Sequence, residues 1–216
     1  MKLIKKTIVK IVYFCGYDLI KHEDNTQNQV LDTSKVTFVN KKALRSKKIN
    51  YGCGPKLMKN WLNVDLCIND KRGFLTANVD LRGKHPFLDN QFQYGFAEDF
   101  IEHLSQSDQI LFLQEVFRTF KRGGVLRLSF PGLEGILKEH YKQGYYDDIL
   151  WARQQAYLQW RHINYPNRKE IVLICKQIGF KSVRFVKYGK STFKELKDLE
   201  TRYLQKSVNT YVEIIK

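Results

Sequence analysis

Two glycines and two carboxylates mark the part of the sequence best suited to holding a small ligand. The stretch INYGCGPKLMKNWLNVDL (residues 49–66) has two short apolar runs around a turn with Gly52 and Gly54, and it ends at Asp65 and Leu66. Glycines let a backbone approach a ligand closely, and a carboxylate can accept two hydrogen bonds from a ribose diol. Asp80 closes the next apolar run, where it could face an adenine amino group.

Phosphate ligands suit this turn poorly. A phosphate-binding P-loop needs a longer glycine-bounded loop that ends in Gly-Lys-Ser/Thr, and this turn has neither the length nor the hydroxyl. A dinucleotide-binding turn needs a third glycine where this chain has Leu57. Pro55 also removes an amide that a pyrophosphate could have used.

The elements that must position these residues alternate between strands and helices. Helices are expected over residues 107–120, 141–160 and 168–178, with Gly123 and Gly124 closing the first and Gly179 closing the last. Such alternation predicts an α/β fold whose mostly parallel sheet has helices on both faces, with ligands beyond the carboxyl ends of the strands. The expected strands are residues 35–39, 49–51, 61–66, 74–79, 93–97, 125–130, 182–188 and 210–215.

Composition limits the partners. The 216 residues carry a formal net charge of +15, which suggests an anionic partner, although a solvated lysine-rich surface would look the same. Four scattered cysteines argue against a disulfide framework and suit a reducing cytoplasm. Residues 1–46 are expected to be a basic arm and linker before a domain of residues 47–216. A helix over residues 1–21 could contact an anionic membrane from the cytoplasm or pack on protein.

Five motifs together resemble the class I S-adenosylmethionine-dependent methyltransferases. They occur between residues 47 and 216 in the order expected of that family, namely INYGCGPKLMKNWLNVDL, NVDLRGKHPFLDNQF, FAEDFIEHL, FKRGGVLRLSFPGLE and GFKSVRFV. More narrowly, the chain resembles small bacterial, type 11-like members associated with surface-polysaccharide biosynthesis. The resemblance implies a Rossmann-like, seven-stranded sheet and S-adenosyl-L-methionine (SAM) as cofactor.

The resemblance also implies roles for individual residues. Gly52 and Gly54 would lie against the methionine part of SAM, Asp65 would bind the ribose hydroxyls, and Asp80 the adenine. The set of cofactor-binding residues implied in this way is Tyr51, Gly52, Cys53, Gly54, Asp65, Leu66, Asp80, Leu81, Ala97 and Glu98. One departure concerns the acceptor side, because this chain has Gly132 after Pro131 where relatives usually have an aspartate.

Methyl transfer to a sugar hydroxyl benefits from a base that takes the proton, by roughly a hundred- to ten-thousand-fold. Histidine suits that role near neutral pH, and His162 is the first candidate, followed by His103 and Glu98. Each has another reading, since His103 could make a structural hydrogen bond, His162 could orient a loop and Glu98 could cap a helix. No metal is predicted, because Asp99 and Glu102 lack a clear third ligand.

Three hypotheses follow for function. The first is a SAM-dependent O-methyltransferase acting on a sugar of a surface glycan or its lipid-linked precursor, with one or two aromatic side chains such as Tyr145, Tyr146 or Trp160 facing that acceptor. The second is an RNA methyltransferase, which the positive charge favours. The chain lacks a base-methylation signature after residue 97, however, so nucleic acid is disfavoured as a partner. The third is a catalytically silent subunit that binds a protein partner.

Overall fold

The computed structural model describes residues 37–38, 45–69, 72–141 and 160–216. The chain divides into two units, Met1–Asp32 and Thr33–Lys216, and every described residue belongs to the second unit. The predicted membrane-binding helix over residues 1–21 and most of the predicted helix over residues 141–160 lie outside the described residues. Both stay predictions, as does the domain boundary at residue 46.

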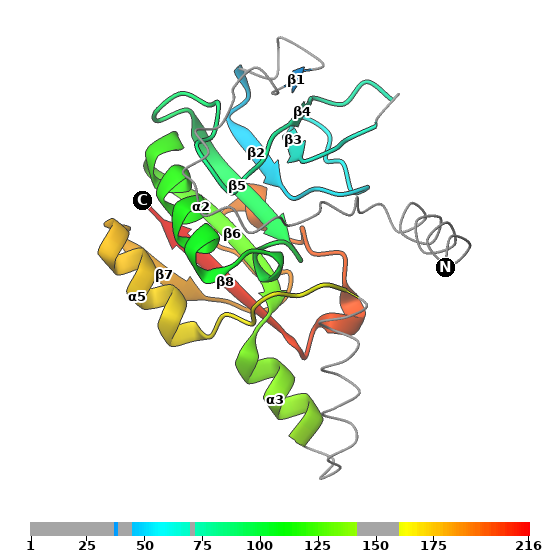
Figure 1. The fold of residues 1–216 in the computed structure, drawn as a ribbon, viewed down its shortest axis with the longest axis vertical. Coiled ribbons are helices and arrows are strands. Elements are labelled where there is room, and N and C mark those ends of the chain that lie inside the picture. Colours follow the sequence, from blue (N-terminus) through cyan, green and yellow to red (C-terminus); the bar gives the residue numbers. More distant parts are fainter. Residues whose placement is uncertain (1–36, 39–44, 70–71, 142–159) are drawn as a thin grey trace, which may run out of the picture. The chain divides into compact units, whose positions relative to one another are not determined.

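The described residues form an eight-stranded sheet in the order β1-β4-β3-β2-β5-β6-β8-β7 (Figure 1). Strands β2 to β6 pair in parallel, β8 is antiparallel to β6 and β7, and β1 is antiparallel to β4. The predicted seven-stranded, mostly parallel sheet is confirmed. The strand expected over residues 35–39 is present as the two-residue β1 at one edge. The strands are β1 Thr37–Phe38, β2 Lys48–Tyr51, β3 Leu62–Asp65, β4 Thr76–Asn78, β5 Phe92–Glu98, β6 Phe120–Pro131, β7 Ser182–Phe185 and β8 Asn209–Ile215.

Helices α2 (Gln106–Thr119) and α5 (Arg168–Ile178) pack together on one face of the sheet (Figure 1). The side chain of Ser105 caps the start of α2, and Asn167 forms a capping box at the start of α5. Gly179 ends α5 in a left-handed conformation, as its position after the apolar run predicted. The remaining helices among the described residues are η3 Ile101–His103, α3 Leu133–Tyr141, η5 Lys194–Leu196 and η6 Tyr203–Gln205.

The opposite face of β5, β6 and β8 is covered by the long connection from β7 to β8, which contains η5. Phe96 and Val125 point to this side, because side chains alternate along a strand, and Leu196 of η5 packs with them in a second core cluster. Arg127, also on this side, is fully buried and forms ion pairs with Glu200 and Glu213. The connection is thereby anchored to the sheet by apolar packing and by buried charge.

The end of α2 differs from the prediction. The helix stops at Thr119, and β6 begins at the next residue, so Gly123 and Gly124 lie within β6 and do not close the helix. Glycine is needed at these positions for other reasons. Gly123 has a positive φ of 75°, and Gly124 has backbone atoms close to its Cβ position.

The connection between β2 and β3 also differs from a standard crossover. Residues 52–61, all of which the structure describes, contain no helix, although parallel neighbours are usually joined through one. Two buried amides hold this loop: Asn50 Nδ2 donates to Asn63 Oδ1 at 3.0 Å and to Lys56 O at 3.0 Å. Asn63 also bonds the backbone of Met58 in both directions. This cage brings the glycine turn directly back to the end of β3.

No helix among the described residues is long and apolar enough to cross a membrane.

Candidate functional site

The glycine turn lies at the carboxyl end of β2, where the fold places ligands. Gly52 and Gly54 have φ values of 56° and 48°, in the left-handed region that favours glycine. A Cβ atom on Gly52 would collide with the ring of Phe100, so the turn approaches this side chain as closely as glycine permits. Apart from its chain neighbours, no atom of the residues that the structure describes lies within 4 Å of the Cβ position of Gly54, which leaves that side of the turn open to a ligand.

Asp65, the last residue of β3, is joined to this turn. Its Oδ2 accepts a hydrogen bond from Gly54 N at 2.8 Å, and its Oδ1 accepts one from Leu66 N at 2.7 Å. Burial raises the pKa of the Asp65 carboxyl, and the two backbone donors oppose that rise. Each oxygen keeps a second lone pair, so the carboxylate can still accept hydrogen bonds from a ribose diol.

Asp80 lies just beyond the end of β4 and is engaged by a neighbour. Arg82 donates to both carboxylate oxygens, with its NH2 atom 2.6 Å from Oδ2. Burial raises the pKa of Asp80, but the hydrogen bonds from Arg82 outweigh it and the pKa is lowered overall. The carboxylate is therefore ionised at neutral pH. Leu81 is buried in the core, so only its backbone can face a ligand.

Glu98, the last residue of β5, is bound by a segment more than a hundred residues away in the sequence. Its carboxylate accepts hydrogen bonds from Thr201 N at 2.9 Å, Thr201 Oγ1 at 2.7 Å and Lys56 Nζ at 3.1 Å. Arg202 N donates to it as well, at 3.3 Å. These donors occupy the lone pairs of the carboxylate. Glu98 therefore holds the loop of residues 199–202 against the strand ends, and none of its oxygens is left to accept a proton from an acceptor hydroxyl.

A small hollow separates the glycine turn from that loop. It encloses about 40 Å³, whereas ligand pockets commonly measure about 300–1,000 Å³. Its walls come from the turn, from β5 and from the loop, and its lining residues are Asn50, Gly52, Cys53, Lys56, Met58, Phe96, Glu98, Leu199 and Thr201. A nucleoside-sized ligand would lie mainly on the open edge beyond Gly54 and Asp65, or the loop would have to move.

Two of the predicted cofactor contacts point away from this edge. The Tyr51 ring is fully buried on the α2 side of the sheet, edge-on to Phe112 with ring centroids 5.1 Å apart. Ala97 is buried in the same core. Their backbones lie at the ends of β2 and β5, but their side chains stabilise the fold. Cys53 lines the small hollow, and burial raises the pKa of its thiol.

His103 and His162, the first two base candidates, lie side by side. Their rings are edge-on with centroids 5.0 Å apart, although 58 residues separate them in the sequence. The backbone oxygen of Glu102 accepts from Ile163 N at 2.8 Å and Asn164 N at 3.1 Å, which holds the two segments together. Burial, and secondly His103, lowers the pKa of His162 to about 4; burial also lowers that of His103.

Glu102 lies between these histidines in a fully buried position. Its Oε1 is 3.9 Å from His162 Nε2, and one ligand atom from each of Glu102, His103 and His162 lies within 4.8 Å of the others. Burial, with a further contribution from Asp99, raises the pKa of Glu102 well above its ordinary value. The prediction of no metal overlooked this grouping, because His162 lies far along the sequence from the other two.

Gly132, the departure from the family pattern, has a structural reason. A Cβ atom at this position would collide with the side chain of Thr210 on β8. A side chain at position 132 would therefore have to displace Thr210, and the carboxylate common in relatives has no room here.

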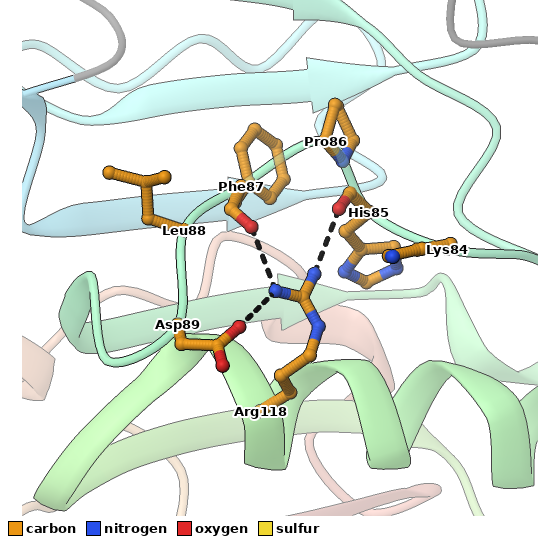
Figure 2. Close-up of a pocket in the computed structure, with 7 residues that line it drawn as sticks. All are labelled: Lys84, His85, Pro86, Phe87, Leu88, Asp89 and Arg118. Atoms are coloured by element: carbon orange, nitrogen blue, oxygen red, sulfur yellow. Dashed lines mark hydrogen bonds and ion pairs between the residues drawn. The ribbon is translucent and has the colours of Figure 1, made fainter.

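A larger hollow, of about 620 Å³, lies toward the amino ends of β5 and β6 (Figure 2). Arg118 of α2 donates to His85 O at 2.8 Å, Phe87 O at 2.9 Å and the Asp89 carboxylate at 2.6 Å. Its remaining donors bind Glu115. All five N–H groups of the guanidinium are thus used within the protein, so Arg118 is a structural cation here and has no donor left for a ligand.

Comparisons with known proteins agree with the fold. No protein-family model matches the chain, and no curated protein matches it. A SAM-dependent methyltransferase of Thermotoga maritima, named a possible histamine N-methyltransferase, is 16% identical with a TM-score of 0.54, over 81% of this chain and 87% of that one. SAM-dependent methyltransferases of Mesorhizobium loti and Archaeoglobus fulgidus are both 13% identical, with TM-scores of 0.52 and 0.50.

The last two similarities cover 79% and 80% of this chain, and 90% and 88% of those proteins. The chain therefore has the Rossmann-like fold of the class I SAM-dependent methyltransferases over most of its length.

Proposed function

We propose that the chain is a SAM-dependent methyltransferase that methylates a hydroxyl group of a sugar, in a surface glycan or its lipid-linked precursor. The observation that carries the cofactor part is the link between Gly54 N and Asp65 Oδ2, 2.8 Å long, at the carboxyl edge of the parallel strands. It joins an open glycine turn to an acceptor for ribose hydroxyls. The similar SAM-dependent methyltransferases support the same cofactor.

The acceptor part is supported by an aromatic side chain beside the histidine pair. Trp160 is 49% exposed, and its ring centroid is 5.9 Å from that of His162. An exposed aromatic face can pack on a sugar ring while neighbouring polar groups bind its hydroxyls. In the reaction the acceptor oxygen forms a bond to the methyl carbon, and the carbon–sulfur bond breaks with its electrons staying on sulfur. The hydroxyl proton is released to solvent. S-adenosylhomocysteine and a methyl ether result.

Calorimetric titration with S-adenosylhomocysteine tests the cofactor part. We expect the parent protein to bind it, and Asp65→Asn to bind at least about tenfold more weakly, because a charge-assisted hydrogen bond to the ribose is lost. Asp89→Asn is the matched control, since Asp89 is an exposed carboxylate at the opposite end of the strands. Equal affinity in the parent and in Asp65→Asn would contradict the assignment of Asp65.

A silent, partner-binding subunit is the second candidate. The small size of the hollow, about 40 Å³, and the complete engagement of Glu98 by the loop of residues 199–202 favour it. A folded parent protein that binds neither S-adenosylhomocysteine nor SAM would support this candidate and exclude the enzyme.

The membrane proposal concerns residues 1–21. We propose that this basic segment contacts an anionic membrane surface, where a lipid-linked acceptor would be found. Sedimentation with anionic liposomes, with and without residues 1–30, tests it. Deletion should abolish cosedimentation at low salt, and unchanged cosedimentation would exclude the arm as the membrane contact.

A further inference from the structure

Three side chains that could bind a metal ion converge beside the carboxyl end of β5. Glu102 and His103 belong to η3, and His162 comes from the segment before α5. One ligand atom from each lies within 4.8 Å of the others. The backbone hydrogen bonds from Ile163 and Asn164 to Glu102 O fix the two segments at this distance. The grouping is therefore built into the fold.

The Glu102 carboxylate is an independent reason to expect a ligand here. The residue has no exposed surface, and neither carboxylate oxygen has a hydrogen-bond partner among the described residues. His162 Nε2 lies 3.9 Å from Glu102 Oε1, which is too long for a hydrogen bond. A buried carboxylate without partners is unfavourable, and a cation between Glu102 and the imidazoles would remove that cost.

The two imidazoles have the orientation that metal ligands need. His103 Nδ1 lies 3.2 Å from the backbone oxygen of Arg161, and His162 Nδ1 lies 3.4 Å from the Tyr165 hydroxyl. Metal-binding histidines commonly donate one ring N–H to such a partner and coordinate through the other nitrogen. For His162 this leaves Nε2, which lies 3.9 Å from Glu102 Oε1, as the coordinating atom.

We propose that Glu102, His103 and His162 bind a divalent transition-metal ion of the Zn²⁺ or Mn²⁺ class. Two imidazoles and one carboxylate are a common ligand set for such ions, and they leave coordination positions open. Ligands at about 2.1 Å around a tetrahedral ion lie about 3.4 Å apart. The 3.9 Å separation of Glu102 Oε1 and His162 Nε2 needs to shorten by about 0.5 Å. The other ligand atoms lie within 4.8 Å, so the side chains would have to close around the ion.

The role of the ion deepens the proposed function and rests on it. An open position would take the acceptor oxygen, and the ion would lower the pKa of that hydroxyl. The proton would then leave to solvent as the oxygen attacks the methyl carbon of SAM. His103 and His162 would act as ligands rather than as the base. Metal binding itself does not depend on this role.

Titration of Co²⁺, Zn²⁺ and Mn²⁺ into chelator-treated, tag-free protein tests the site. Calorimetry should show about one equivalent bound for at least one of these ions. Bound Co²⁺ should show the visible absorption bands that are typical of a Co²⁺ ion with a low coordination number. We expect Glu102→Gln and His162→Gln to lower the affinity by about a hundredfold or more. Glu195→Gln, which alters an exposed carboxylate on η5, should bind like the parent.

Circular dichroism and thermal unfolding show whether each variant is folded, and the ion should raise Tm in the parent but not in Glu102→Gln. No saturable binding by the folded parent, or parent-like affinity in both folded variants, would overturn the site. The experiment needs no SAM. Metal binding without S-adenosylhomocysteine binding would refute only the proposed function, and the reverse result would refute only the metal site.

Discussion

At the scale of single residues, the site depends on how closely the backbone of Gly52 approaches the Phe100 side chain. Gly52 meets the Phe100 ring at its Cβ position, whereas Gly54 faces open space, and both have positive φ. Both glycines thus need a left-handed backbone conformation, but only Gly52 lacks space for a side chain. The same turn directs Gly54 N to Asp65, so its conformation determines where a ribose could bind.

Gly52→Ala should destabilise the protein more than Gly54→Ala. Both variants strain the backbone by about 1–3 kcal/mol, but only Gly52→Ala adds a collision with Phe100. Urea unfolding should give a difference between them of at least about 1 kcal/mol. In a Phe100→Ala background this difference should shrink, because contacting residues couple. Equal losses in both variants would show that Phe100 moves aside freely.

Which site residues could be predicted depends on whether their signal is local. Gly52, Gly54 and Asp65 lie within fourteen residues of sequence, and their spacing follows from one strand, turn and strand. Thr201 belongs to no motif, so its bonds to Glu98 could not be predicted. The pairing of Glu102 with His162 depends on where a distant segment returns, which no local pattern specifies.

At the scale of elements, the connection between β7 and β8 is held by a buried charge cluster. Arg127 on β6 forms ion pairs with Glu200 and Glu213 and also donates to Lys187 O and Lys190 O. The anchor at Glu200 is next to Thr201, which binds Glu98. The cluster therefore determines where this loop lies over the strand ends.

Arg127→Met should lower the free energy of unfolding by about 3–5 kcal/mol, because two carboxylates would remain buried without their cation. Arg122→Met is the matched control, since Arg122 is exposed on the same strand, and it should change stability by no more than about 0.5 kcal/mol. Denaturant unfolding measures both. A small effect of Arg127→Met would mean that the connection packs well without its ion pairs.

Strand and helix periodicity predicted most elements, whereas their connections were less predictable. Helix α5 has the predicted bounds, residues 168–178, and ends at Gly179 as predicted. The predicted end of α2 was wrong, because a basic residue followed by two glycines resembles a helix terminus. Here these glycines lie within β6, which begins directly after the helix. The helix-free β2–β3 loop depends on an amide pair across two strands, Asn50 and Asn63, which pattern alone does not reveal.

At the scale of the whole molecule, pH should alter stability through the buried His85. Burial lowers the pKa of its imidazole to about 4, against about 6.5 in an unfolded chain. Between these values the unfolded state binds a proton that the folded state does not. Stability is therefore complete above about pH 6.5, falls as pH falls toward 4, and changes no further through this group below that. The charged groups that act on the imidazole are Glu115, Arg118 and Asp80.

The fall in unfolding free energy from pH 7.5 to pH 5 should be about 2 kcal/mol smaller in His85→Gln than in the parent. Urea unfolding at the two pH values measures it. Lys84→Gln changes the exposed neighbouring residue and should keep the parent's dependence. Identical pH dependence in His85→Gln and the parent would mean that His85 takes up its proton equally in both states.

The amide cage between β2 and β3 also has a consequence for how quickly the sheet can assemble. It lets Ile49 pair with Leu62, only thirteen residues away, whereas Val125 must find Ile215 ninety residues along the chain. Closing a short loop costs less entropy, and contacts between near neighbours in sequence form sooner. The glycine turn of residues 52–54 would then be among the earliest structured parts of the folding chain, and the β6–β8 pairing would complete the sheet last.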